Sequence, residues 1–378
     1  MLIFQRTIEN IISKNLFKGR MIAIFGPRQS GKTTLSKKLI LPYGVDGAYF
    51  DCQLAEIRKH FVVGEPSILQ ELVADKKIVV FDEAQTIQNI GVILKVFIDT
   101  YPDVQVITTG SSSFDLANKI NEPLTGRSFE FTLYPLSFEE IRRTKKVTRD
   151  EFYEYLRLGM YPAIVGESDT YTRENLLKNI TTNYLYKDVY IFESIRNPQI
   201  FEDLLKLLAH QIGQLVSVNE LSLALGTSRT TVQKYLTLLE QSYVIQRVRS
   251  FSHNHRNELK KAFKVFFIDV GIRNAIIDAL ETPLEERNDK GALFENFCVT
   301  EQWKAGSLET FPPKILFWRT DTKLEIDIIK VTNQKIEAIE CKWSDHNVSF
   351  RTFLNKYPDA TTQIITPEKI LNGNDYII

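Results

Sequence analysis

The residues best suited to chemistry lie near the amino end, in the run GPRQSGKT over residues 26–33. This run matches the pattern GxxxxGK[ST], in which backbone N–H groups of a glycine-rich loop surround phosphate oxygens. Gly26 and Gly31 allow the backbone angles that such a loop needs. Lys32 can reach the β and γ phosphates, and the Thr33 hydroxyl can bind Mg²⁺. The sequence therefore predicts a site for ATP and Mg²⁺, the alternative being a glycine turn before a helix.

Two adjacent acids, Asp82 and Glu83, follow the apolar run IVVF further along the chain. After a phosphate loop, the first acid at such a strand tip holds the Mg²⁺ shell, so Asp82 and Thr33 are the predicted metal residues of the nucleotide site. Glu83 is placed to orient or polarise a water, which predicts hydrolysis in addition to binding. The alternative for the pair is a solvated turn.

Two further polar residues are candidates for phosphate contacts. Ser111 follows the apolar run VQVITT and is the predicted sensor of the γ phosphate, unless it belongs to a Ser-rich turn. Arg127 can reach a phosphate of its own or a neighbouring subunit as arginine fingers do, and a salt bridge is the alternative. A finger acting between subunits would imply a homo-oligomer.

The predicted catalytic residues are thus Lys32, Glu83 and Arg127. The residues predicted to bind the nucleotide are Gly26, Pro27, Arg28, Gln29, Ser30, Gly31, Lys32, Thr33, Thr34, Asp82 and Ser111.

A second candidate site lies near the carboxyl end, where LEIDIIKV and KIEAIECKW have the alternation of two hairpin strands. A turn centred on Asn333 and Gln334 places Asp327 opposite Glu340. Facing carboxylates repel each other unless a cation lies between them, so the pair predicts a second, divalent metal site. Lys342 falls on the same face and is placed to steer a phosphate or an attacking water. The alternative is a salt-bridged hairpin edge.

The elements that position these residues follow from the apolar periodicity. Over residues 21–131, short apolar runs alternate with helix-length amphipathic stretches, which is typical of βαβ units around a parallel sheet. The following stretch is helical, and strands return from residue 262 around one helix. Helices of the middle stretch are expected over residues 137–143, 149–158, 171–184 and 199–212. We therefore expect an α/β protein with domains over residues 1–135, 136–261 and 262–378.

Within the middle domain, a helix over residues 218–225, a turn around Gly226 and a second helix that begins after Ser228 resemble a winged helix-turn-helix. Its second helix would expose a short polar and basic end. The residues at that end are Arg229, Thr230, Thr231 and Lys234. Between residues 229 and 264, eight lysines and arginines stand against two acids, with His253 and His255 among them. This predicts contact with double-stranded DNA, and a winged helix that packs on protein is the alternative.

Composition limits the function classes. The chain has 378 residues, in which 47 basic and 47 acidic residues cancel, so any nucleic-acid role must come from local asymmetry. Its three cysteines, Cys52, Cys298 and Cys341, are too few for a disulfide framework and indicate a reducing compartment. With no apolar run of about 18 residues and no signal-peptide pattern, we expect a cytoplasmic protein without a membrane partner.

Taken in order, the motifs resemble a large prokaryotic family of AAA+ ATPases, related to the STAND group, that carry a C-terminal domain of unknown function. The motifs that carry this resemblance are GPRQSGKTTL, VVFDEAQ, VITTGSSS, TGRSFEFTLYPLSFEE, GMYPA, GALFENF, FWR, EIDII and IECKW. The resemblance implies an AAA-type P-loop NTPase, a winged helix and a restriction-endonuclease-like α/β domain. The hairpin pattern of an acid followed by ExK looks like the PD-(D/E)xK nuclease core, in which a preceding helix gives a further metal-binding acid. Glu295 fits that position, whereas Ile326 stands where the motif has Pro.

These observations predict an ATP-hydrolysing protein whose nucleotide state controls a C-terminal region that binds DNA and, with a working metal site, cleaves it. The alternative is an ATP-gated protein- or DNA-binding switch in which the nuclease-like domain is catalytically inert.

Overall fold

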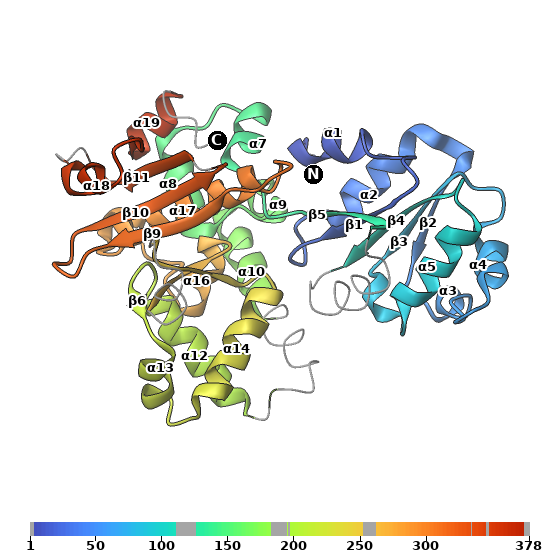
Figure 1. Ribbon diagram of the computed structural model, residues 1–378, viewed down its shortest axis with the longest axis horizontal. Helices are drawn as coiled ribbons and strands as arrows, with labels where there is room; N and C mark the ends of the chain where they lie inside the picture. The colour runs from blue at the N-terminus through green and yellow to red at the C-terminus, as the bar shows by residue number, and fades with distance from the viewer. Residues whose placement is uncertain are drawn as a thin grey trace. The chain divides into compact units, whose positions relative to one another are not determined.

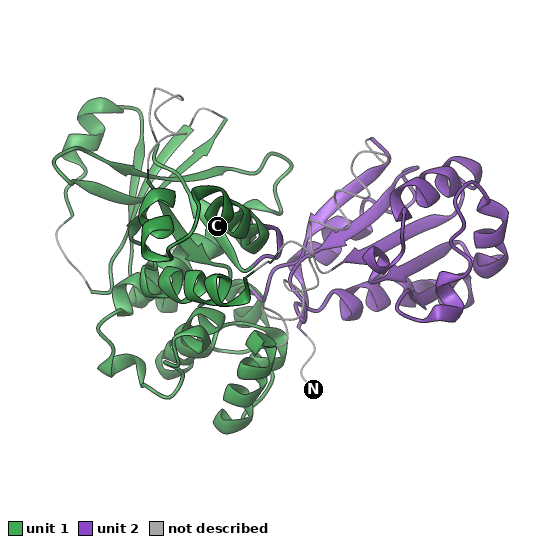
Figure 2. Cartoon of the chain, turned by 90° about the horizontal axis from the view of Figure 1, so that it is seen from below, with its two compact units in different colours: residues 1–3, 137–240, 244–378 green, residues 4–136, 241–243 purple. Residues whose placement is uncertain are grey.

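The computed structural model describes residues 4–110, 126–182, 195, 197–251, 262–333, 335–344 and 348–373. The chain forms two compact units, shown in different colours in Figure 2. The N-terminal unit comprises residues 4–136 and 241–243, and the C-terminal unit comprises residues 1–3, 137–240 and 244–378. The end of the first unit lies one residue from the predicted domain boundary at 135. The two following domains of the prediction instead form one unit.

The N-terminal unit is built around a parallel sheet of five strands in the order β2-β3-β4-β1-β5 (Figure 1). Every residue of β1 and β3 is buried, as expected for inner strands of a parallel sheet that is covered on both faces. The strands are β1 (Met21–Phe25), β2 (Gly47–Asp51), β3 (Ile78–Asp82), β4 (Gln105–Gly110) and β5 (Ser128–Thr132). The helices are α1 (Thr7–Ser13), α2 (Lys32–Ile40), α3 (Ala55–Arg58), α4 (Pro66–Val73) and α5 (Ile90–Thr100). The predicted α/β class and parallel sheet are confirmed.

The parallel order decides where the candidate residues of this unit meet. All neighbouring strands of the sheet run in the same direction, so their carboxyl ends share one edge. The loops that follow β1, β3 and β4 therefore begin at the same edge, which is where ligands bind in open α/β sheets.

The first part of the C-terminal unit is mainly helical, as predicted. The helices are α7 (Phe138–Thr144), α8 (Arg149–Leu158), α9 (Pro162–Val165), α10 (Thr170–Thr181), α12 (Pro198–His210), α13 (Val218–Ala224), α14 (Arg229–Gln241) and α16 (Val270–Ile276). Three short strands, β6 (Leu215–Val216), β7 (Ile245–Val248) and β8 (Phe263–Phe267), form an antiparallel sheet in the order β6-β8-β7. The bounds of α8 are those predicted, and both α7 and α8 begin with a Ser or Thr capping box that fixes their first turn.

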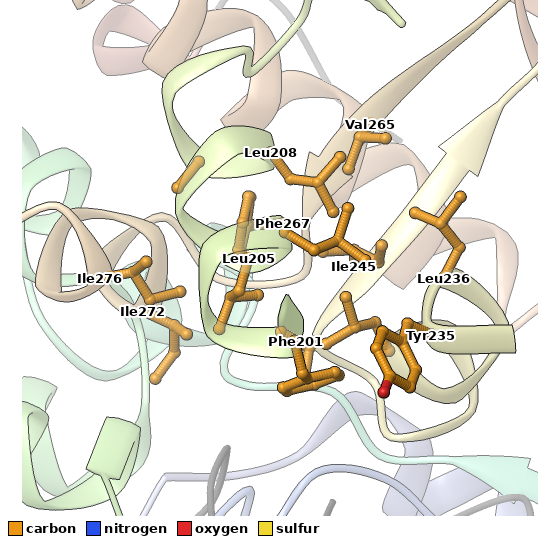
Figure 3. Close-up of a cluster of buried hydrophobic side chains, with 14 of the residues drawn as sticks. Phe201, Leu205, Leu208, Tyr235, Leu236, Ile245, Val265, Phe267, Ile272 and Ile276 are labelled. Carbon is orange, nitrogen blue, oxygen red and sulfur yellow. The ribbon is translucent and has the colours of Figure 1, made fainter. Parts of the chain in front are cut away.

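The position of β8 differs from the predicted division of the chain. An apolar run identifies a strand but does not say which sheet the strand joins. β8 had been placed in a third domain that begins at residue 262, yet it is the central strand of the sheet with β6 and β7. Phe267 of β8 packs in one core with Phe201, Leu205 and Tyr235 (Figure 3). A boundary at 261/262 would therefore cut through a sheet and its core.

The second part of the C-terminal unit is a four-stranded sheet in the order β12-β11-β10-β9. Its strands are β9 (Lys314–Arg319), β10 (Glu325–Thr332), β11 (Lys335–Cys341) and β12 (Thr361–Ile365), and its helices are α17 (Lys290–Gly306), α18 (Arg351–Lys356) and α19 (Pro367–Asn372). The pairs of β10 and β11 run from Ile328 opposite Ile339 to Thr332 opposite Lys335, which is the predicted register. The register of β10 against β9 shifts between Ile326 and Ile329, so a bulge lies around Asp327.

In the part of the chain that the structure describes, no helix has the length and apolar composition needed to cross a membrane.

Replacement of Phe267 by Ala tests the assignment of β8 to the helical core. The side chain is fully buried, so the cavity and the lost transfer energy should lower the free energy of unfolding by about 3 to 5 kcal/mol. Urea unfolding followed by circular dichroism measures this loss. The control is Phe311→Ala, which removes a phenyl ring that is 72% exposed and should change stability little. Equal stabilities of the two variants would contradict this core.

Candidate functional site

The predicted phosphate loop lies between β1 and α2. Gly26 has φ 144°, and a Cβ there would lie 2.2 Å from the carbonyl oxygen of Leu133, so a larger residue would clash with fixed backbone. Gly31 has φ 98° and occupies the N-cap position of α2. Two glycines are therefore required where the sequence analysis placed them, and the loop delivers the chain directly into the amino end of a helix. Such an end is favourable for anions.

Lys32 begins α2, and its ammonium lies inside the loop. Its Nζ atom donates to the carbonyl oxygens of Gly26 at 2.9 Å and Pro27 at 2.8 Å. The Lys32 side chain is buried, whereas Arg28 and Gln29 in the middle of the loop are exposed. This buried cation and the helix end give the loop a positive charge that suits phosphate groups.

Arg6 also supports the loop, and the sequence analysis missed it. One guanidinium nitrogen donates to the carbonyl oxygen of Ser30 at 2.7 Å, and another donates to that of Tyr134 at 2.6 Å. The arginine thus ties the loop to the segment that follows β5. A single basic residue ahead of the first strand has no local pattern that would have revealed this contact.

The carboxylate of Asp82, at the tip of β3, accepts hydrogen bonds from three neighbouring elements. The hydroxyl of Thr33 on α2 donates to Oδ2 at 2.8 Å, and that of Tyr49 on β2 donates to the same oxygen at 2.5 Å. Thr109 on β4 donates to Oδ1. Burial and the neighbouring carboxylate raise the pKa of the Tyr49 hydroxyl above its usual range, which keeps the hydroxyl protonated and able to donate.

Glu83, directly after Asp82, has a backbone conformation that non-glycine residues rarely adopt, with φ 52° and ψ 42°. Its N–H donates to the hydroxyl of Thr109 at 3.0 Å, and its carboxylate accepts from the amide of Gln85. A left-handed residue of this kind costs about 1 to 2 kcal/mol, and such strain is concentrated at functional sites.

The chemistry of these groups fits a magnesium nucleotide. Mg²⁺ takes oxygen ligands and is usually held by one or two protein groups together with phosphate oxygens and waters. Thr33 and Asp82 supply a hydroxyl and a carboxylate whose oxygens are already 2.8 Å apart, beside the Lys32 ammonium. Thr34, which follows in α2, is exposed.

Arg127 lies at the opposite edge of the sheet from the phosphate loop. It precedes β5, and its carbonyl oxygen accepts from the N–H of Met21, the first residue of β1. The five residues of β1 therefore separate it from the loop, a distance of roughly 15 Å. Its guanidinium pairs with Asp99 at 2.8 Å, which is the salt bridge weighed as the alternative. The parallel strand order therefore contradicts the predicted contact of Arg127 with a phosphate bound to its own chain. Ser111 lies outside the described residues.

The C-terminal carboxylates that the sequence grouped form part of a larger ion-pair cluster. Lys264 of β8 is 1% exposed, and its ammonium lies 2.8 Å from Glu295 of α17 and 2.6 Å from Glu325 of β10. Arg319 of β9 pairs with Glu325 at 2.9 Å. The charge pattern predicts that Lys264 contributes to DNA binding, and its burial between two acids overturns that prediction.

The predicted pair of Asp327 and Glu340 is present in the same cluster, together with Lys342. The Lys342 ammonium lies 2.6 Å from Glu340 and 3.5 Å from Asp327, and Asp327 also accepts from the N–H of Cys341 at 2.9 Å. Burial, with the Asp327 carboxylate nearby, raises the pKa of Glu340 to about 7 and that of Glu295 to about 8. Lys342 thus joins the predicted pair of Asp327 and Glu340, whereas the ion pair of Glu295 is with Lys264.

Lysine side chains, however, pair with these acidic groups in the structure. Among the described residues, no group of three or more His, Cys, Asp and Glu side chains has an arrangement that could hold a metal ion. The metal roles of Glu295, Asp327 and Glu340 stay predictions. The three cysteines are buried and free.

The middle of the chain has the predicted helix, turn and helix. Helix α13 is followed by a short turn in which Gly226 has φ 60°, and the Ser228 hydroxyl caps α14 by accepting from the N–H of Thr231 at 3.1 Å. Arg229 and Lys234 are exposed on α14. Arg249 is exposed as well, whereas Arg247 pairs with Glu240 and is less available than the charge count indicated. The residues of the basic segment over residues 229–264 that lie outside the described part are His253, His255, Arg256, Glu258, Lys260 and Lys261.

Comparison with protein families places the N-terminal unit in a known class. Residues 18–142 match the family model described as an AAA domain. Together with the parallel sheet and the phosphate loop, this match identifies the unit as a P-loop domain of the AAA class and supports ATP binding. Residues 149–282 and 290–375 match two models described as domains of unknown function, DUF8612 and DUF4143. These two matches assign no activity.

Several uncharacterized proteins are similar to the chain. A Mycobacterium tuberculosis protein is 28% identical over 331 residues, covering 87% of this chain and 71% of its own length. One from Methanocaldococcus jannaschii is 23% identical over 394 residues, covering 98% and 86%. A Haemophilus influenzae protein is 29% identical over 186 residues, and the match spans 46% of each chain. The chain therefore spans less than half the length of this last relative in their alignment.

Two solved structures are similar to parts of the chain. The Thermotoga maritima RuvB Holliday junction branch migration motor is 16% identical with a TM-score of 0.36, covering 68% of this chain and 95% of its own. A STAND protein with a tetratricopeptide repeat sensor from Pyrococcus horikoshii is 12% identical with a TM-score of 0.30, covering 82% and 48%. At these TM-scores neither superposition carries an argument.

The raised pKa values predict how stability changes with pH in EDTA. Between the ordinary value of 4.5 and about 8, folded Glu295 keeps a proton that the unfolded chain has released. The unfolded state then binds fewer protons, so the free energy of unfolding falls as pH rises through this window, by at most about 1.4 kcal/mol per pH unit for one group. Glu295→Gln should flatten this fall, as measured by urea unfolding from pH 5 to pH 8.5.

The matched control for this measurement is Glu309→Gln, which changes an exposed glutamate of the same unit and should keep the slope of the natural protein. An unchanged slope in Glu295→Gln would mean that Glu295 is charged throughout this range.

Proposed function

We propose that the protein hydrolyses ATP in its N-terminal unit. The observation that carries this proposal is the meeting of the phosphate loop with Asp82 and Glu83 at one edge of the sheet. Thr33 and Asp82 already share a hydrogen bond of 2.8 Å, beside a loop that encloses the Lys32 ammonium. A site that only bound nucleotide would have no need for a second acid in a strained backbone conformation.

The residues of the loop have distinct roles in this proposal. Backbone N–H groups of residues 28–33, at the amino end of α2, bind the phosphates, and Lys32 interacts with the β and γ phosphates. Thr33 and Asp82 hold the Mg²⁺, which supplies positive charge where the leaving oxygens gain negative charge. Glu83 accepts a proton from the attacking water or orients it. Arg6 holds the loop through the carbonyl of Ser30.

Glu83→Gln should separate binding from hydrolysis. The amide keeps the size of the side chain but is no longer a base, so ATP turnover should fall about 100-fold or more while ATP affinity stays nearly unchanged. Phosphate release and calorimetric ATP binding measure the two quantities. Lys32→Ala should lose both, and Glu71→Gln, on the exposed side of α4, should lose neither. Undiminished turnover in Lys32→Ala would refute the proposal.

We further propose that the nucleotide state controls binding of double-stranded DNA by the C-terminal unit. Support comes from the capped, exposed amino end of α14, which follows α13 after a four-residue connection around Gly226 and carries Arg229 and Lys234. A recognition helix of a helix-turn-helix contacts DNA through this end. The second candidate role is a protein-binding switch, which the ion-paired state of Arg247 and Lys264 favours because it reduces the free positive charge.

The salt dependence of duplex binding distinguishes these roles. Each phosphate contact contributes a slope of about −0.9 to the plot of log affinity against log salt, so the combined Arg229→Ala and Lys234→Ala replacements should reduce the slope by about 1.8. Titration of a labelled duplex with and without ATP at several salt concentrations gives the values. Lys356→Ala, on α18, is the matched control and should keep the slope. If the protein binds ATP but its binding to the duplex does not depend on salt, the protein-binding switch is the correct role.

We also propose that the C-terminal unit cleaves DNA, with a catalytically inert unit as the alternative. Support comes from Asp327 and Glu340, which share Lys342 as a partner, and the pairing of these acids and of Glu295 with lysines supports the inert alternative. Incubation of plasmid DNA with Mg²⁺ or Mn²⁺ decides between them. Cleavage by the natural protein that is lost in Asp327→Ala would establish a nuclease, and intact DNA under every condition would establish the inert form.

A further inference from the structure

Tyr49 reaches the tip of the neighbouring strand, although its own position on β2 is two residues before the end. In the parallel pairing of β2 with β3, Asp51 is opposite Asp82 and Tyr49 is opposite Val80. Residues two apart on a strand share a face, so Tyr49 and Asp82 are diagonal neighbours on the same side of the sheet. The tyrosine is long enough to cover this diagonal, and its hydroxyl ends 2.5 Å from Oδ2 of Asp82.

Helix α2 covers the same face and holds the ring in place. Thr33, in its first turn, donates to Asp82, and the Lys37 ammonium, about one turn further on, lies 4.3 Å from the centre of the Tyr49 ring. A cation over the face of an aromatic ring is attracted to it. The ring is thus held by the helix that also carries the phosphate-binding lysine.

The hydrogen bonds at Asp82 nearly fill its capacity as an acceptor. A carboxylate has about four acceptor positions on its two oxygens. Among the described residues, hydroxyls of Thr33 and Tyr49 donate to Oδ2, and that of Thr109 donates to Oδ1. One acceptor position, on Oδ1, is then left for a further donor such as a water of a metal shell. The Thr33 hydroxyl donates its hydrogen bond to Asp82, so the lone pairs of its oxygen stay available for a cation.

We propose that Tyr49 is a positioning residue for the Mg²⁺ of the bound nucleotide, acting through Asp82. Its hydroxyl fixes the orientation of the carboxylate and, with that of Thr33, occupies Oδ2, so Oδ1 is the oxygen with which Asp82 would hold the metal shell. The role rests on the proposed magnesium nucleotide site. Nothing in the spacing of the sequence marks this tyrosine, because the contact depends on the register between two strands.

Tyr49→Phe tests this role, because it removes the hydroxyl and keeps the ring against Lys37. Loss of a residue that hydrogen-bonds to a metal ligand typically lowers metal affinity by about 10- to 100-fold. We expect the Mg²⁺ concentration that gives half of the full ATP affinity to rise about tenfold in the variant. Calorimetric ATP titration over a series of Mg²⁺ concentrations measures it, and ATP affinity in EDTA should stay unchanged. A matched control is Tyr43→Phe, whose ring packs on Phe17 in the same unit.

Each result of this experiment has a defined meaning. An unchanged Mg²⁺ requirement in Tyr49→Phe would overturn the positioning role. An equal loss of ATP affinity in EDTA and in Mg²⁺, together with a lower free energy of unfolding, would also overturn it and make Tyr49 a packing residue. Natural protein that binds ATP in a Mg²⁺-dependent way but releases no phosphate would refute hydrolysis while leaving this role measurable. Natural protein that binds no ATP would refute both.

Discussion

The chemistry of the N-terminal unit depends on one buried carboxylate that is held by hydroxyls from three elements. Asp82 lies at the end of β3 and accepts from Thr33 on α2, Tyr49 on β2 and Thr109 on β4. A buried charge without hydrogen bonds would cost several kcal/mol, and these donors replace the water that it gives up. Since they come from different strands and from the helix, the carboxylate keeps its position only if the sheet and α2 are both intact.

The same carboxylate shows which parts of the site a sequence can predict. The phosphate loop and the two acids were found because their signals are local: glycines, a lysine and a hydroxyl at fixed spacing, and acids directly after an apolar run. Tyr49 and Thr109 were missed because their contacts with Asp82 follow from strand register, which no short pattern encodes. Arg127 was assigned to the phosphates for a related reason, since its distance from the loop is set by the parallel order of β5 and β1.

In the C-terminal unit, the sequence predicts the hairpin of β10 and β11 but not the ion pairs that its acidic residues and Glu295 make. Alternation within β10 and β11, with a short turn between them, sets their register, and the structure has that register. The partner of Glu295 is Lys264, which lies 31 residues away on β8 and was predicted to belong to a basic segment that contacts DNA. Buried charges of this kind are stabilised only as a group, because removal of one partner leaves the others uncompensated, at a cost of about 3 to 5 kcal/mol.

The burial of Lys264 also limits how this protein can evolve by exchange of segments. Its strand belongs to the segment over residues 149–282, and its partners Glu295 and Glu325 belong to the segment over residues 290–375. A recombinant that joined either segment to an unrelated neighbour would enclose a charge with no counter-charge. The two segments therefore depend on each other for charge compensation, although sequence comparison divides them into separate modules.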